Sequence, residues 1–323
     1  MNKILKLLYI APLSALATII LLSWTLWGEA ALSFLPYIVG VYSFYMIILT
    51  FIMFLNHQEF KRINLYWINW LTVFFLFMGI YSFYFDIGAV AYSHDPRATK
   101  IVGANMWYKN EKVEDIEKFF KDEDADVLML TEYTPSHADY LDDFLTENYP
   151  FKIIQFENLT FPFTGKAIYS KYPLIQNDLP NAYEKEMFLS GGVQIADKVA
   201  DLVMVHSTAP VTKNYFDARN KQFEYMKTEI LEGSESTAII TGDFNVSPWS
   251  PRFVDINRKM KLNNMKRVAG NKFDFSWELQ KAPFFKSLID HTFVSSDVRV
   301  KSYELKDFPG SDHKAQVFTV ELD

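Results

Sequence analysis

The chain contains no cysteine among its 323 residues. Disulfide bonds, thiolate nucleophiles and cysteine-ligated zinc sites are therefore excluded. The absence does not fix the cellular compartment, because a protein in an oxidising compartment need not contain disulfides.

Charged residues are missing from three long stretches near the N-terminus, at residues 7–27, 30–55 and 63–85. Each stretch exceeds the roughly 20 apolar residues that a helix needs to cross about 30 Å of hydrocarbon. Three consecutive runs of this length favour membrane spans over buried helices of a soluble core. We therefore expect residues 1–88 to form a membrane anchor of three transmembrane helices.

The first run follows two lysines, as the core of a cleaved signal peptide does. It is longer than the about 7 to 15 apolar residues of such a core, and two more runs follow it directly. We therefore interpret the first run as an uncleaved span.

The basic residues around the runs predict the orientation. Lys3 and Lys6 precede the first run, and Lys61 and Arg62 separate the second from the third, whereas the turn between the first two runs has no basic residue. By the positive-inside rule both basic segments face the cytoplasm. We expect a multi-pass protein of the cytoplasmic membrane, with everything after about Asp86 on the extracytoplasmic side.

An excess of positive charge is also missing. The basic and acidic residues before Arg97 cancel, so residues 97–323 carry the whole formal charge of −7. A broad nucleic-acid surface needs lysine and arginine to neutralise phosphates. Nucleic acid is therefore not the favoured partner, although a local basic patch is compatible with this charge.

Residues 89–99 resemble a short polar linker, and residues 100–323 are long enough for one large globular domain. Within this domain short apolar runs alternate with segments of helical period. We expect helices at 111–122, around 140–145 and at 213–231, and strands at 101–106, 127–130, 151–154, 166–169, 193–195, 202–206, 237–240, 288–289, 292–294 and 316–320. Many short strands with few crossover helices favour an α+β domain of packed sheets with outer helices.

Polar side chains follow several of these strands at the point where each strand ends. They are Asn105, Glu132, His206, Asp243 with Asn245, Asp290, and Asp312 with His313. Carboxylates suit a hard divalent cation such as Mg²⁺, which stabilises charge on a phosphoryl oxygen. A histidine beside a carboxylate has a fixed tautomer and transfers protons near neutral pH. The pattern predicts metal-assisted hydrolysis of phosphate esters, with Glu132 as the first metal ligand and His313 paired with Asp290.

The ordered set of segments resembles the endonuclease/exonuclease/phosphatase superfamily, whose fold is that of DNase I. The segments are Leu130-Thr131-Glu132, Ser170 to Leu174, Val205-His206, Gly242 to Asn245, Ile289 to His291 and Ser311 to His313. The set is specific although each member alone is weak, and it covers nearly all of residues 100–323. The resemblance implies a four-layer α/β/β/α sandwich with the site at converging strand ends and loops.

The resemblance also implies a metal site. Glu132 would bind the ion, with Asn105 close by and Asp312 as an additional ligand. We expect Mg²⁺, with Mn²⁺ as the alternative. Several superfamily members carry a second polar residue two positions after the strand Asn, whereas this chain has Trp107; Asn110 could compensate.

For catalysis, the resemblance implies that Asp243 orients or deprotonates the attacking water and that Asn245 holds a phosphate oxygen. His313, held by Asp290, would act as base or phosphate stabiliser. His206 would contact the phosphate and help the leaving group, although a buried core histidine is the alternative interpretation of that residue.

Three other polar residues are expected to be structural. His291 alternates away from the predicted site along its strand. Arg219 and Gln222 resemble a recurrent pair in the superfamily, and we interpret them as helix surface or as a brace behind the site.

The expected function is hydrolysis of a phosphodiester by a membrane-tethered enzyme, because the tether and the acidic domain favour a lipid head group or another envelope phosphodiester. A metal-dependent nuclease is the second hypothesis. A degenerate binding domain without turnover is the third, and the joint presence of Glu132, Asp243, Asn245, Asp290 and His313 argues against it. The sequence does not indicate an oligomeric state.

Overall fold

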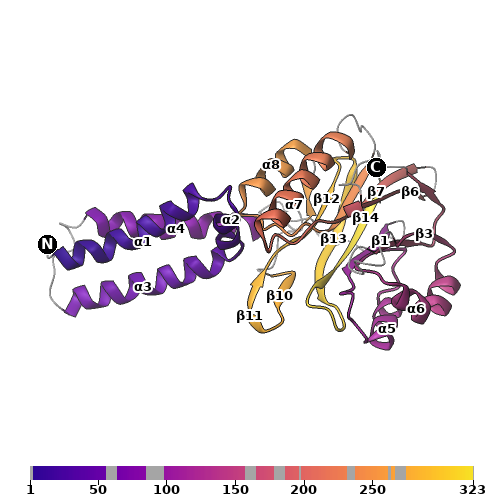
Figure 1. The fold of residues 1–323 in the computed structure, drawn as a ribbon, viewed down its shortest axis with the longest axis horizontal. Helices are drawn as coiled ribbons and strands as arrows, with labels where there is room; N and C mark the ends of the chain where they lie inside the picture. The colour runs from indigo at the N-terminus through magenta and orange to yellow at the C-terminus, as the bar shows by residue number, and fades with distance from the viewer. Residues whose placement is uncertain are drawn as a thin grey trace.

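A computed structural model describes residues 3–55, 64–84, 98–156, 165–177, 186–195, 198–230, 237–260, 263–265 and 274–322. Most of the predicted linker at 89–99 lies outside these residues. A bundle of N-terminal helices extends from a larger domain of sheets and helices (Figure 1).

The N-terminal bundle consists of α1 (Lys3–Leu21), α2 (Leu26–Ser33), α3 (Leu35–Leu55) and α4 (Asn64–Tyr84). Among the described residues, α3 and α4 are each long and apolar enough to cross a membrane. Residues Leu7–Leu21 of α1 and the helix α2 satisfy the same test only as a pair, and this pair is bent by 117°. The chain thus has two or three candidate spans, and the single uninterrupted helix expected from residues 7–27 is not formed.

The break between α1 and α2 has a local cause. Thr25 has extended backbone angles and its side chain accepts a hydrogen bond from the Gly28 amide, which starts a new helix. A Cβ on Gly28 would lie 2.0 Å from the Leu22 carbonyl oxygen, so the turn is closed tightly around a glycine.

The apolar surface of the bundle fits a membrane environment. On α3 the buried residues recur every three or four positions, as on one helix face, and they include Val39, Met46 and Met53. The opposite face is also apolar and is exposed, with Val41 at 71% and Phe51 at 60% exposure. An apolar surface of this extent is rare on soluble proteins.

The larger domain contains two six-stranded sheets within its described residues. The first sheet has the order β13 (Val298–Asp307), β14 (Lys314–Leu322), β1 (Thr99–Asn105), β2 (Val127–Thr131), β4 (Lys166–Ser170) and β3 (Phe151–Gln155). The second has the order β5 (Leu174–Gln176), β6 (Phe188–Ile195), β7 (Lys198–His206), β8 (Ala238–Asp243), β12 (Asp290–Val294) and β9 (Asn263–Asn264). A separate hairpin is formed by β10 (Trp277–Leu279) and β11 (Ala282–Ser287).

Helices cover the outer faces of both sheets (Figure 1). On the first sheet lie α5 (Val113–Glu123) and α6 (Pro135–Asn148), which bury Phe120 and Leu141 against it. On the second lie α7 (Lys213–Tyr225), its π-helical continuation η4 (Met226–Ile230) and α8 (Pro251–Met260). The inner faces of the two sheets share the largest core cluster, so the predicted sandwich of two sheets with outer helices is present.

Several elements differ from the sequence expectation. Residues 288–289 form no strand and instead lead into β12, and the helix expected at 213–231 changes to π geometry at Met226. The long strand β13, helix α8 and the β10–β11 hairpin were not predicted.

Candidate active site

The site lies where strands of the two sheets end next to each other. Asn105 is the last residue of β1, and its register partner on the parallel strand β2 immediately precedes Glu132. In the second sheet His206 is opposite Asp243, and Asp243 is opposite Asp290. Backbone pairing therefore places these predicted residues in two adjoining groups.

Glu132 is the centre of the first group. Asn105 Nδ2 donates to one carboxylate oxygen at 3.0 Å, and the Tyr108 amide donates to the other at 3.0 Å. His206 Nε2 lies 3.4 Å from the first oxygen and links the two sheets. Burial favours the neutral acid, but the interactions with His206, the Tyr108 amide and Asn105 outweigh it and lower the pKa of Glu132 to about 2. The side chain is therefore a carboxylate at neutral pH.

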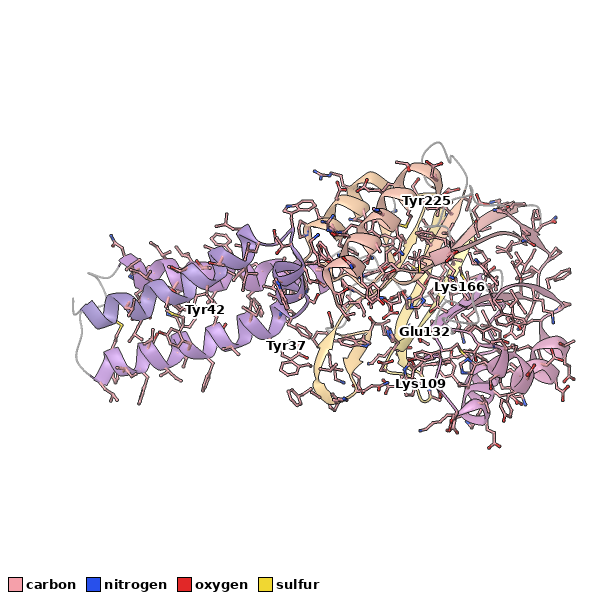
Figure 2. All side chains as sticks on the ribbon, viewed as in Figure 1. Tyr37, Tyr42, Lys109, Glu132, Lys166 and Tyr225 are labelled. Carbon is pink, nitrogen blue, oxygen red and sulfur yellow. The ribbon has the colours of Figure 1, made fainter. Side chains whose placement is uncertain are left out.

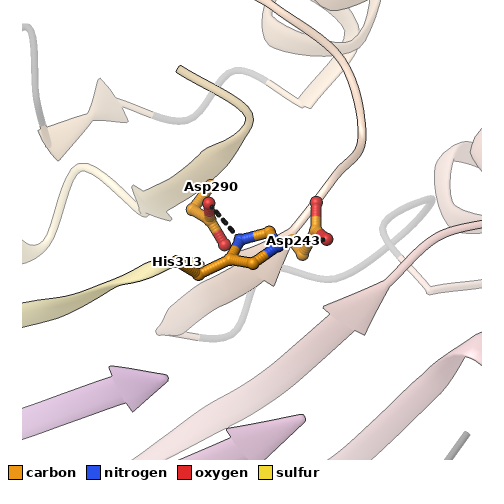
Figure 3. Close-up of side chains that lie close together, drawn as sticks. All are labelled: Asp243, Asp290 and His313. Atoms are coloured by element: carbon orange, nitrogen blue, oxygen red, sulfur yellow. Dashed lines mark hydrogen bonds and ion pairs between the residues drawn. The ribbon is translucent and has the colours of Figure 1, made fainter. Parts of the chain in front are cut away.

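The second group joins His313 to two aspartates (Figure 3). His313 Nδ1 lies 2.9 Å from Asp290 Oδ2, and its Nε2 lies 3.8 Å from Asp243 Oδ2. Burial disfavours the charged ring, but the two carboxylates outweigh it and raise the pKa of His313 to about 10. Burial, followed by the charge of Asp290, raises the pKa of Asp243 to about 7 despite the opposing effect of His313.

The turn after β8 fixes Asp243 and Asn245 relative to each other. Gly242 has φ 144°, and a Cβ there would lie 1.9 Å from the Val205 carbonyl oxygen, so the neighbouring strands meet only around glycine. The Asn245 amide donates to Asp243 Oδ1 at 2.8 Å. Asn245 Nδ2 donates to Ser207 O at 2.8 Å and to Asp243 Oδ2 at 3.1 Å.

Asp312 directly precedes His313 and interacts electrostatically with both His313 and Glu132. Its Oδ2 accepts a hydrogen bond from Trp277 Nε1 at 3.2 Å, and Trp277 also forms an isolated β-bridge with His313. Its Oδ1 is buried and has no hydrogen-bond partner among the described residues. Burial is the main cause of the raised pKa of Asp312. An orphaned, buried carboxylate oxygen is a site where a cation would relieve the cost of burial.

The donor set fits a hard divalent cation. Glu132 is an ionised carboxylate, and Asp312 offers an oxygen without a partner. Asp243, Asp290 and His313 also lie close enough to share an ion, with ligand atoms within 4.8 Å. In that group, however, the ring of His313 already lies between the two carboxylates, 2.9 Å from Asp290 and 3.8 Å from Asp243. Glu132 is thus the better position, and Asn105 orients it, because the Asn105 oxygen accepts from the Trp107 amide.

Two further predicted residues have structural surroundings. His291 Nε2 lies 2.8 Å from the Val246 carbonyl oxygen, and its ring packs against Phe253. Asn110 donates to two backbone carbonyl oxygens and accepts from the Lys112 amide, so it braces loops. The suggestion that Asn110 replaces the missing polar group at position 107 is therefore not supported.

Arg219 and Gln222 on α7 brace the loops behind the site. Arg219 is fully buried and donates to the Asn245 carbonyl oxygen at 2.7 Å, and Gln222 holds Thr208 through two hydrogen bonds. Arg219 also forms an ion pair with Glu29 of α2, which is 3% exposed. A residue of the N-terminal bundle thus supports the turn that carries Asn245.

Sequence reasoning missed Glu29 and Trp277. Glu29 did carry a signal, because it is the acidic residue between two uncharged runs. The sequence gives no such signal for Trp277, because its contact with Asp312 depends on the β10–β11 hairpin, which no periodic pattern predicts.

A family model for endonuclease/exonuclease/phosphatase proteins matches residues 102–313 of the chain. The chain belongs to the endonuclease/exonuclease/phosphatase family. Members of this family are phosphoester hydrolases and generally depend on divalent metals, which supports this coarse class for the chain. The comparison with curated proteins gives no match.

Solved structures of the endonuclease/exonuclease/phosphatase family share the fold. An endonuclease/exonuclease/phosphatase from Bacteroides vulgatus has 20% sequence identity to this chain and a TM-score of 0.55. The match covers 70% of this chain and 99% of the Bacteroides vulgatus chain. TDP2 of D. rerio, complexed with a single-strand DNA product, has 16% identity and a TM-score of 0.57, covering 70% and 100%. The catalytic domain therefore has the expected DNase I-like fold with two sheets.

Proposed function

We propose that the chain is a divalent-metal-dependent phosphodiesterase that acts on a lipid head group or another envelope phosphodiester outside the cytoplasmic membrane. One observation supports this reaction class. The Glu132–His206 pair lies next to the group of Asp243, Asp290 and His313, at adjoining strand ends. Glu132 and Asp312 would hold the ion, which would stabilise negative charge on a phosphate oxygen.

The remaining residues have complementary tasks. Asp243, fixed by Asn245, is placed to orient and deprotonate water. His313, held by Asp290, presents Nε2 toward Asp243 and would stabilise the phosphate as a cation. His206 Nε2 points toward the Glu132 carboxylate and would contact the phosphate next to the ion.

The N-terminal bundle supports a lipid substrate. The Tyr37 hydroxyl of α3 donates to Phe284 O at 2.8 Å, and the Ser287 hydroxyl donates to Ser33 O at 2.9 Å. The hairpin that carries Trp277 is therefore attached directly to the apolar helices. A substrate that resides in the membrane would meet the site without leaving the bilayer surface.

A nuclease is the second candidate, favoured by the shared fold with a TDP2 structure that contains a single-strand DNA product. The formal charge of −7 opposes it, because DNA affinity comes largely from lysine and arginine contacts to phosphates.

The test is turnover by the purified full chain of a chromogenic phosphodiester, phospholipids and single-stranded DNA. We expect hydrolysis with Mg²⁺ or Mn²⁺ and its loss with EDTA. Asp243→Asn and His313→Ala should each lower kcat by roughly 10²- to 10⁴-fold, because each removes a charged or proton-transfer group. Asp217→Asn on the exposed surface of α7 is the control and should leave the rate unchanged.

Preferential cleavage of DNA would replace the lipid proposal with the nuclease. Absence of turnover on every substrate, with lipid binding unaffected by Asp243→Asn and His313→Ala, would instead identify a binding domain without catalysis.

A further inference from the structure

An apolar pocket of about 620 Å³ lies where the bundle meets the catalytic domain. Its size is within the range of pockets that bind small ligands. Its walls come from α1, α3 and the β10–β11 hairpin and include Leu16, Ile19, Tyr37, Val41, Leu279 and Phe285. Tyr37 marks this junction in Figure 2, whereas Tyr42 lies further along the helices.

The lining requires no polar group from an occupant. It contains no charged side chain, and its polar atoms are those of three tyrosines. The hydroxyls of these tyrosines are already hydrogen-bonded within the protein, Tyr37 to Phe284 O, Tyr42 to Asn69 and Tyr45 to Leu8 O. Water in such a pocket would lack the two to four polar partners that ordered water needs. The surroundings therefore favour a hydrocarbon occupant.

The same hairpin forms a wall of the pocket and a wall of the active site. Leu279 lines the pocket, and two residues earlier Trp277 donates to Asp312 and bridges to His313. Two residues of strand span about 7 Å. Tyr37 fixes this arrangement, because its hydroxyl donates to Phe284 O and accepts from the Lys286 amide at 3.0 Å.

We propose that this pocket binds the hydrocarbon chain of the lipid substrate while its phosphate head group occupies the active site. The inference rests on the proposed function, whose substrate class it specifies. Because α1 and α3 belong to the apolar bundle, a chain would enter from the surrounding lipid without crossing water. Val41, on the pocket wall, is 71% exposed on the outside of α3, so the pocket borders the lipid-facing surface.

The first test is photolabelling of the full chain in phosphatidylcholine nanodiscs that contain a phosphatidylcholine with a diazirine near the end of one acyl chain. Adducts should concentrate on peptides that contain Val41 and Leu279. Ala15 lines the pocket, so Ala15→Trp should fill it and remove these adducts. Ala17 lies two residues further along the same helix, is exposed and is outside the lining, so Ala17→Trp should leave the labelling unchanged.

The second test compares hydrolysis of dipalmitoyl and dihexanoyl phosphatidylcholine. Ala15→Trp should raise KM for the long-chain lipid but not for the short-chain lipid, because it removes the packing contacts between the acyl chain and the pocket. The rate on a soluble chromogenic phosphodiester should not change, because the site itself is intact. Ala17→Trp should match the wild type on all three substrates.

The outcomes separate the two proposals. Equal labelling of the wild type and Ala15→Trp, or adducts spread evenly over α4, would overturn the chain-binding pocket even if phospholipids are hydrolysed. Adducts that Ala15→Trp removes, in a protein that hydrolyses no lipid, would support the pocket and overturn the lipid phosphodiesterase.

Discussion

Three residues around the active site have left-handed backbone angles. Their φ values are 53° for Trp107, 52° for Glu132 and 48° for Asn245. Asparagine adopts this region readily, whereas a bulky side chain does so at a cost of order 1 kcal/mol or more. The hydrogen bonds to Glu132 from Asn105 and the Tyr108 amide hold it in place against this cost. The backbone strain at Glu132 is therefore found at the residue whose carboxylate is held toward the site.

Because Gly242 has no side chain, β8 can pass close to the Val205 carbonyl oxygen just before Asp243. Gly242→Ala should lower the free energy of unfolding by roughly 3 kcal/mol, because the added carbon overlaps backbone that cannot move aside. Activity should fall together with stability, because the shifted backbone would displace Asp243. The measurement is the thermal midpoint in detergent together with turnover.

Gly40→Ala is the matched control for that change, because a Cβ on Gly40 of α3 has nothing within 4 Å. Its midpoint should stay the same or rise. Equal effects of the two substitutions would show that the close approach at Gly242 does not limit stability.

His291 predicts a pH dependence of stability. Burial lowers its pKa to about 4 from 6.5, despite the hydrogen bond to Val246 O and the charge of Asp290. Between these values the unfolded chain binds more protons than the folded chain, so the free energy of unfolding rises with pH across this window. Acidification from pH 6.5 to about 4 should cost up to about 3 kcal/mol.

His291→Gln removes the titrating group and keeps a donor for Val246 O. Thermal midpoints of the two proteins measured at several pH values should therefore diverge below about pH 6.5, with the variant less sensitive to acid. Parallel curves would contradict a neutral, buried His291.

At the scale of elements, the buried pair of Glu29 and Arg219 joins α2 to α7. Burial lowers the pKa of Arg219, and the charge of Glu29 opposes this effect. Removing one partner of a buried pair typically costs about 3–5 kcal/mol, because the other charge stays buried alone. Glu29→Ala should therefore lower the thermal midpoint, and it should lower kcat because Arg219 supports Asn245.

The double variant Glu29→Met with Arg219→Met should recover much of the lost stability, because the two fully buried charges are removed together and only the partly exposed Arg252 loses its ion pair with Glu29. Asp217→Ala on the same helix breaks an exposed pair with Lys213 and should cost less than about 1 kcal/mol. A Glu29→Ala protein as stable as Asp217→Ala would show that the bundle does not support the site.

The elements that were predictable from sequence are those with a complete local pattern. β1, β2, β7 and β8 combine an apolar run with a polar residue at its end, and both the strands and their terminal side chains were identified. β13 also carries a local pattern that was overlooked, because its apolar and polar residues alternate as in a half-buried strand. The β10–β11 hairpin instead takes its position from Tyr37 and Ser33 of the bundle. Contacts between distant elements of this kind leave no periodicity in the sequence.

At the scale of the whole molecule, the helix ends that flank the two basic segments lie together at one end of the bundle. Tyr9 near the start of α1 bonds to Met53 near the end of α3, and Asn69 near the start of α4 donates to Tyr9 O at 3.2 Å. The start of α1, the end of α3 and the start of α4 therefore lie together, at the end of the bundle away from the larger domain (Figure 1).

This arrangement yields a topology prediction. Lys3, Lys6, Lys61 and Arg62 lie in these two segments, so the positive-inside rule assigns that end of the bundle to the cytoplasm and the catalytic domain to the other side. A reporter enzyme that is active only outside the cytoplasm should be active when fused after Asp323 and inactive when fused before Met1. Inactivity of the fusion after Asp323 would contradict the orientation, and with it access to any substrate on the outer surface.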